Sequence, residues 1–130
     1  MSDLSGRTLF WAPRVLSVLF IGFLSLFALD VFGEGFGFWR TLAALAVHLI
    51  PSLVLIAALV VAWRWEWVGA AIYGAAGMLY ILNLVGRPRP PLAVKLQWMA
   101  VIAGPALAIA ALFLANWWKH DQLRRRARPV

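Results

Sequence analysis

The chain has 130 residues, of which 64% are hydrophobic and 13% are charged, and its formal net charge is +7. Soluble domains carry about 45–50% apolar and about 25% charged residues, so a water-soluble fold of this composition would expose too much apolar surface. The chain has no cysteine, which excludes disulfides, thiolate nucleophiles and cysteine-ligated metal sites. The composition therefore indicates a protein that is surrounded by the lipid bilayer.

Four apolar stretches follow one another along the chain. The length of each is close to that of a membrane-spanning helix, which needs about 20 residues to cross about 30 Å of hydrocarbon. They cover residues 11–32, 39–63, 67–85 and 96–118. None of them alternates between polar and apolar residues as the strands of membrane barrels do. Short connections make neighbouring helices antiparallel. The sequence thus predicts an all-α, integral membrane four-helix bundle of up-down-up-down order, forming a single domain over residues 1–130.

The three connections differ in composition. "GEGFGF" offers glycines for a turn, "RWE" predicts a very tight hairpin, and the prolines of "GRPRPPLAVK" predict a connection without helix. The first stretch is followed by no convincing cleavage site, so we interpret it as a permanent span. Lys and Arg are more frequent beside the termini and the second connection than on the other side. This bias predicts that both termini are cytoplasmic.

A basic tail, residues 119–130, follows the last apolar stretch. Close to a membrane span, such a tail is more typical of contact with anionic lipid headgroups than of nucleic-acid binding. The residues that we expect to contact headgroups are Arg124, Arg125, Arg126 and Arg128. No phosphate-binding loop, nucleophile elbow or HExxH motif is present. We therefore predict no catalytic residues and a protein that is not an enzyme.

Most of the polar side chains in the apolar stretches fall toward one side of the membrane, the side opposite the termini. The predicted polar cluster consists of Asp30, Glu34, Arg40, His48, Asn83 and Arg87. Ionisable groups inside a membrane are costly and normally face the interior of a bundle with partners. The cluster is either a structural network or a functional site, such as a proton relay or a small-ligand pocket.

Two ligand-binding interpretations of this cluster remain open. Asp30, Glu34 and His48 could hold a divalent metal ion, because carboxylate and imidazole groups are metal ligands and Asp30 and Glu34 would share one face of an α-helix. Alternatively, His48 could ligate a tetrapyrrole, since the small residue Ala44 one turn earlier leaves room for a flat macrocycle. The identity of any cofactor stays open.

Tryptophans mark the opposite interface. In "WRWEW", residues 63–67, we expect Trp63, Trp65 and Trp67 to anchor at headgroup level, with Arg64 and Glu66 exposed to water. Stripes of small residues in the last two spans predict close packing of helices, either within the chain or between copies. These stripes are Ala70, Gly74 and Gly77, and Gly104, Ala108, Ala111 and Ala115. Pro51 and Pro105 predict bends in the second and fourth spans.

The segments "RVLSVLFIGFLSLFALDVFGEGFGFW", "HLIP" and "AWRWEWVGA" resemble a family of small bacterial four-helix membrane proteins of unknown function. The resemblance covers roughly the first 80 residues and places Asp30, Glu34, His48 and Glu66 within its motifs. It implies a four-helix integral membrane protein and no established activity, and with the four predicted spans we expect a multi-pass protein of a bacterial inner membrane.

Together these observations predict a small non-enzymatic membrane protein that acts as an accessory or oligomeric subunit. It would be a homo-oligomer or part of a larger membrane complex. The alternatives are an oligomeric transporter or channel for protons or small cations, and a metal- or tetrapyrrole-binding protein that uses His48.

Overall fold

The computed structural model describes the backbone of residues 2–126 and the side chains of residues 6–120. In chain order it contains α1 (Ser2–Leu26), the 3₁₀ helix η1 (Phe27–Glu34), α2 (Phe38–Ala62), α3 (Glu66–Val85), α4 (Leu92–Trp98), the π-helical segment η2 (Met99–Ala103) and α5 (Gly104–Arg126). Four continuous helical stretches are long and apolar enough to cross a membrane: Gly6–Glu34, Phe38–Ala62, Glu66–Val85 and Leu92–His120. The predicted all-helical architecture with four membrane-length helices is thereby confirmed, and the up-down-up-down order across the membrane and the orientation stay predictions.

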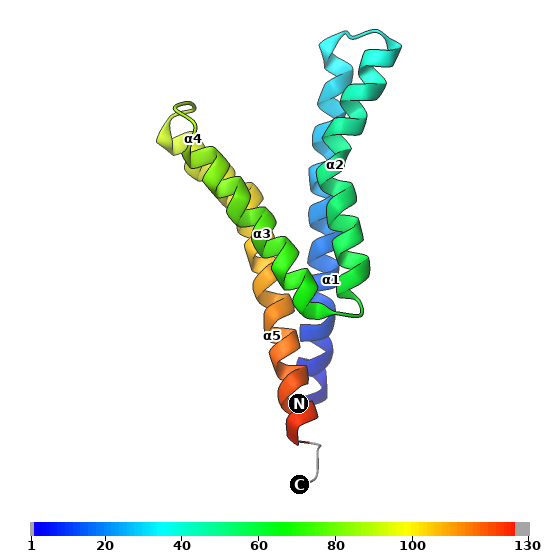
Figure 1. The fold of residues 1–130 in the computed structure, drawn as a ribbon, viewed down its shortest axis with the longest axis vertical. Helices are drawn as coiled ribbons and strands as arrows, with labels where there is room; N and C mark the ends of the chain where they lie inside the picture. The colour runs from blue at the N-terminus through cyan, green and yellow to red at the C-terminus, as the bar shows by residue number, and fades with distance from the viewer. Residues whose placement is uncertain (1, 127–130) are drawn as a thin grey trace.

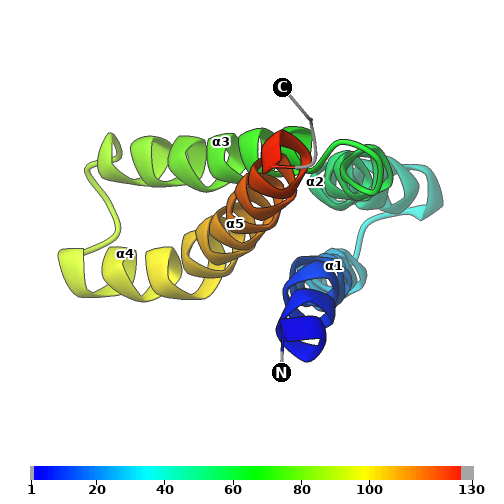
Figure 2. The ribbon, with the colours of Figure 1, turned by 90° about the horizontal axis from the view of Figure 1, so that it is seen from below.

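The helices form two hairpins that meet at one end and diverge toward the other, so that the molecule has the shape of a V (Figure 1). One arm consists of α1, η1 and α2, and the other consists of α3 and the α4–η2–α5 helix (Figures 1 and 2). We call the end at the Trp63–Trp65 link, where the arms meet, the closed end. The end with the turns at residues 35–37 and 86–91 is the open end. The arm of α1 and α2 extends further at the open end.

Small residues allow the arms to approach each other toward the closed end. Gly69 of α3 is buried, and a Cβ atom at this position would lie 2.6 Å from the Cβ of Ala62 and 3.0 Å from the ring of Phe113. The main core cluster also contains Ala58, Ala106 and Ala110 together with larger side chains from all four spans. Because this close packing is confined to about half the length of the spans, the arms separate beyond it.

The two predicted stripes of small residues have different roles. On α3, Gly74 and Gly77 face α5, where their nearest neighbours are Ala110 and Leu107. On α5, however, Ala108, Ala111 and Ala115 are exposed. The stripe that is buried is shifted by about half a turn and runs from Ala103 at the end of η2 through Ala106 and Ala110 of α5. Small residues are frequent on several faces of this helix, so spacing alone does not select the packed face.

The turns and helix irregularities refine the predicted connections. The first span continues as a 3₁₀ helix to Glu34, and Gly35 ends it with a φ of 66°, a conformation that glycine adopts without steric cost. The third connection is shorter than predicted, because α4 begins at Leu92, directly after Pro91. A proline is tolerated just before or at the start of a helix. The π-helical segment precedes Pro105, whose ring disturbs the preceding turn.

Candidate functional site

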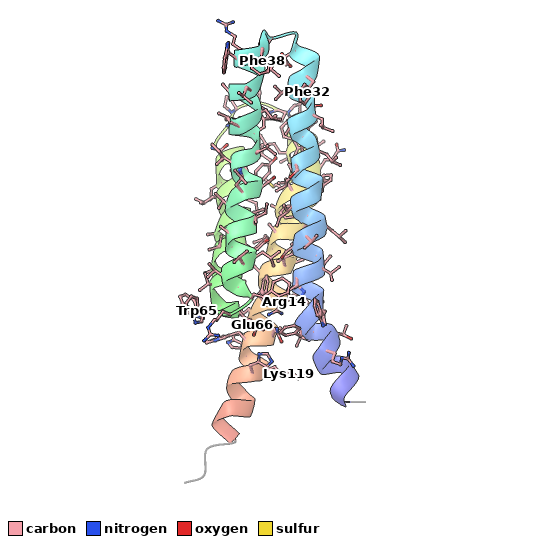
Figure 3. The ribbon with its side chains drawn as sticks, turned by 90° about the vertical axis from the view of Figure 1, so that its right-hand side faces the viewer. Arg14, Phe32, Phe38, Trp65, Glu66 and Lys119 are labelled. Atoms are coloured by element: carbon pink, nitrogen blue, oxygen red, sulfur yellow. The ribbon has the colours of Figure 1, made fainter. Side chains whose placement is uncertain are left out.

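The charged and amide side chains that the structure buries lie together near the closed end. One Glu66 oxygen, Oε1, accepts hydrogen bonds from Arg14 at 3.2 Å and from Asn116 at 2.5 Å. The other oxygen, Oε2, accepts a hydrogen bond from Nδ1 of His120 at 3.0 Å. Figure 3 shows Arg14 and Glu66 facing each other between the helices. We call these four residues the Glu66 centre; it joins α1, α3 and α5.

Arg14 is almost completely enclosed, with 1% of its surface exposed. Its guanidinium donates to the carbonyl of Phe10, one helical turn earlier, and stacks over the Phe10 ring at 3.6 Å from the ring centroid. The rings of Trp63 and Phe113 lie further out around the same group. Among the described side chains, Nε of Arg14 is buried without a hydrogen-bond partner. The positive charge is therefore balanced mainly by Glu66 and by the surrounding aromatic faces.

Helix geometry explains how these side chains converge. Glu66 is the first residue of α3, where a carboxylate interacts favourably with the positive end of the helix dipole. Asn116 and His120 are four residues apart on α5 and thus share one face, which they direct at the same carboxylate. The short link between α2 and α3 places Glu66 within reach of Arg14 on α1 and of Asn116 on α5.

A cavity of about 430 Å³ adjoins the Glu66 centre and opens among the tryptophans of the closed end. Aromatic side chains form most of its wall: Phe10, Trp63, Trp65, Trp67 and Trp117. Three other residues complete the lining, namely Arg64, Glu66 and His120. We call this feature the aromatic cavity. It combines a buried carboxylate, an exposed guanidinium and several aromatic faces.

The expectation that Glu66 is exposed to water was wrong, because 8% of its surface is exposed and it carries the buried ion pair. The pairing of Arg14 with Glu66 was not predicted either, because Arg14 counted only among the basic residues on the side of the termini. Two signals could have identified the pair. Arg14 is the one basic residue within the predicted first span, and Glu66 is an acid just before the predicted third span, so both belong to the same side of the membrane in an antiparallel hairpin order.

The polar cluster predicted on the opposite side is located at the open half of the molecule, but its members are not assembled there. Asp30, Glu34, Arg40, Asn83 and Arg87 are exposed. Within the described side chains, the ion pair that forms is that of Glu66 with Arg14 at the closed end, and His120 hydrogen-bonds to the same carboxylate. In the open half Lys95 donates to the backbone carbonyl of Arg87.

The proposed metal ligands Asp30, Glu34 and His48 are likewise not brought together. The side chains that the structure describes include no group of three His, Asp or Glu residues placed to hold a metal ion. The physical reason lies partly in η1. A 3₁₀ helix has about 3.0 residues per turn, so Asp30 and Glu34, four residues apart in η1, do not share a face.

His48 is exposed on the surface of α2. Its Nδ1 lies 2.9 Å from the carbonyl of Ala44, which requires the proton on this nitrogen and leaves Nε2 of the neutral ring as an acceptor. The ring lines an apolar hollow of about 310 Å³ with Leu24, Phe27, Val47 and Pro51. Ligation of a tetrapyrrole by His48 stays a prediction.

The tryptophans predicted as interface anchors, Trp63, Trp65 and Trp67, are each about half exposed at the closed end. Figure 3 shows Trp65 at the edge of the helices at this level. Trp67 follows Glu66 at the start of α3, and Trp117 adds a further indole from α5. The side chains of Arg124, Arg125, Arg126 and Arg128 lie outside the described residues, so their predicted contact with lipid headgroups is untested.

Comparison with known proteins places the whole chain in one family. Residues 1–129 match the family model described as "Domain of unknown function (DUF7670)". The chain belongs to this family. No curated protein and no solved structure matches the chain. Membership of DUF7670 agrees with the resemblance to an uncharacterised family, and with the four membrane-length helices it describes a small multi-pass membrane protein.

Proposed function

We propose that this chain is a non-enzymatic protein of a bacterial inner membrane and acts as a subunit that associates with a second copy of itself. The association surface lies in the open half, where His48 hydrogen-bonds through Nδ1 to the carbonyl of Ala44 and where, among the described residues, the side chains of Tyr80 and Gln97 have no hydrogen-bond partner. The observation that carries the proposal is the exposure of His48 well inside the membrane-length helix α2.

The position of His48 along α2 supports this depth. It follows Phe38 by ten residues and precedes Trp63 by fifteen, which correspond to about 15 Å and about 22 Å at 1.5 Å per residue. Polar groups this far inside a membrane normally face other protein groups, because lipid offers no hydrogen-bond donor. The acceptor Nε2 of His48 therefore favours a donor from outside the chain.

Matching donors are present on the other arm. The Tyr80 hydroxyl and the Gln97 amide line a second hollow of about 440 Å³, together with Phe27, Trp98, Val101 and Ile102. Within the described residues, neither polar group has a hydrogen-bond partner. Phe27 lines both hollows, so they adjoin each other. In a twofold-symmetric dimer, His48 of each copy can accept a hydrogen bond from Tyr80 or Gln97 of the other.

A transporter or channel is the alternative functional class. It requires polar groups that form a continuous path, whereas among the described side chains Asp30, Glu34 and Arg40 form no hydrogen bond or ion pair with His48. No specific observation favours this alternative. The dimer proposal accounts for the same exposed His48, because Tyr80 and Gln97 of a second copy supply the hydrogen-bond donors.

Substitution of Gln97 by leucine tests the proposal. Hydrogen bonds between membrane helices contribute about 0.6 kcal/mol on average and up to about 1.7 kcal/mol, and a symmetric dimer loses two of them. We therefore expect dimerisation of Gln97→Leu in lipid nanodiscs or mild detergent to weaken roughly tenfold, and that of His48→Leu to a similar extent. The measurement is the monomer–dimer equilibrium by fluorescence energy transfer between labelled copies.

Asn83→Leu is the matched control, because it removes an exposed amide from the same end of the molecule. This variant should associate as the wild type does. A wild-type chain that stays monomeric in lipid at all accessible concentrations would refute the proposal. So would a visible chromophore that purifies with the wild type and disappears in His48→Leu, because His48 would then be a pigment ligand.

A further inference from the structure

The aromatic cavity at the closed end has the composition of a binding site for an organic cation. Its walls are five aromatic side chains, four of them indoles. Aromatic faces attract ammonium groups through the negative charge above and below the ring, and Trp does so most strongly. Interface anchoring accounts for tryptophans at this level, but not for their arrangement around a hollow that also contains a carboxylate.

The Glu66 carboxylate retains hydrogen-bonding capacity toward this cavity. A carboxylate has about four acceptor positions, two on each oxygen. Among the described side chains, Oε1 receives the hydrogen bonds of Arg14 and Asn116, whereas Oε2 receives that of His120 alone. Glu66 and His120 both line the cavity. The free position on Oε2 therefore suits an additional N–H donor.

Arg64 supplies the opposite charge at the edge of the same cavity. It is exposed in the link between α2 and α3 and also lines the cavity. A guanidinium is well suited to a phosphate group. A ligand with an ammonium near Glu66 and a phosphate near Arg64 would match both charges. This pattern belongs to a zwitterionic phospholipid headgroup.

We propose that the aromatic cavity binds the headgroup of an aminophospholipid, with the primary ammonium donating to Oε2 of Glu66 and the phosphate contacting Arg64. A primary ammonium is favoured over a trimethylammonium, because only the former can donate a hydrogen bond to the carboxylate. The exposed tryptophans place the cavity at headgroup level, where such lipids are present at high local concentration. The site lies away from the open end and is independent of dimerisation.

Lipid titration of the full chain, delipidated in detergent, tests this site. The probes are phosphatidylethanolamine, phosphatidylcholine and phosphatidylglycerol with identical acyl chains, and bound lipid is counted by native mass spectrometry. We expect phosphatidylethanolamine to bind at least about tenfold more tightly than the other two lipids. Water-soluble phosphoethanolamine should compete for the site if the headgroup carries recognition.

Two pairs of variants locate the binding. Trp117→Leu removes a cavity wall and Arg64→Gln removes the phosphate contact, and each should reduce phosphatidylethanolamine binding about tenfold. Their controls are Trp118→Leu and Arg7→Gln, which alter exposed residues of the same types that do not line the cavity. None of these four residues contributes a hydrogen bond to the Glu66 centre, so the fold should survive.

Equal binding of phosphatidylethanolamine and phosphatidylcholine would overturn the assignment, because it would mean that no hydrogen bond from the ammonium is recognised. Tighter binding of phosphatidylglycerol would also overturn it and would identify a basic site for anionic lipid. The assignment fails as well if Trp118→Leu lowers binding as much as Trp117→Leu does, since the cavity wall would then have no special part in binding.

Discussion

Replacing Arg14 with methionine is expected to lower the free energy of unfolding by about 3–5 kcal/mol, because removal of one partner leaves the Glu66 charge buried and uncompensated. Arg14 is 1% exposed and reaches Glu66 at 3.2 Å, so water cannot replace the lost guanidinium without a rearrangement of the helices. The measurement is reversible unfolding in mixed micelles with increasing dodecyl sulfate, followed by tryptophan fluorescence.

The double variant Arg14→Met/Glu66→Gln separates the charge effect from lost packing. Replacing both members of a buried ion pair by neutral groups is often close to neutral for stability. The double variant should therefore recover a substantial part of the loss, which appears as a coupling energy between the two sites. Arg7→Met, at an exposed position on the same helix, is the matched control and should change stability little. A loss in Arg14→Met no larger than that in Arg7→Met would show that the ion pair does not hold the closed end together.

Gly69→Ala is expected to destabilise the protein by about 1–3 kcal/mol, the cost of overpacking a close contact. The added methyl group would lie 2.6 Å from the Cβ of Ala62 and about 3.0 Å from the Phe113 ring, so α3 must move away from α2 and α5. The measurement is the same unfolding titration, combined with proteolytic susceptibility of the link at the closed end.

Gly22→Ala is the control for this substitution. Gly22 lies within α1, and an added Cβ would meet nothing within 4 Å. Glycine inside a helix is less stable than alanine by about 0.5–1 kcal/mol, so this variant should be unchanged or slightly more stable. Opposite signs for the two glycine substitutions would show that the contact at Gly69, and not helix propensity, determines the outcome. A neutral Gly69→Ala would contradict the observed packing of α3.

The two ends of the molecule have different roles. At the closed end, the Glu66 centre ties α1, α3 and α5 together and forms one wall of the aromatic cavity. At the open end, the arms separate and leave His48, Tyr80 and Gln97 beside hollows. Failure of lipid recognition would leave the dimer proposal intact, and failure of dimerisation would leave the lipid site intact, because the two surfaces share no residue.

The membrane-spanning helices were predictable because hydrocarbon imposes a strong and local constraint. A run of about 20 apolar residues has few ways to satisfy its backbone in lipid other than as a helix. The second predicted span, residues 39–63, therefore differs from α2, Phe38–Ala62, by one residue at each end. The ends of the first and fourth spans were less predictable, since Asp30 and Glu34 continue the first span in η1 and Lys95 lies inside α4.

The candidate site was predictable in part. The tryptophans of "WRWEW" indicated an interface at the level where the site lies. The pairing of Arg14 with Glu66 was not predicted, because the two residues are 52 positions apart and each has an ordinary explanation alone. The polar residues near the opposite side of the membrane suggested a cluster only because they lie at a similar depth in the membrane. Depth does not determine on which side of its helix a residue lies, so these side chains need not meet.

The sequence by itself indicated lipid surroundings and determined the number of membrane-length helices, since both depend on local composition over one helix length. Only the tertiary structure decided which faces meet, where the charges pair and where the arms part. The physical reason is that every side of these helices is apolar enough for lipid. The choice among faces is then made by close contacts such as that of Gly69 and by the need of Arg14 and Glu66 to neutralise each other away from water.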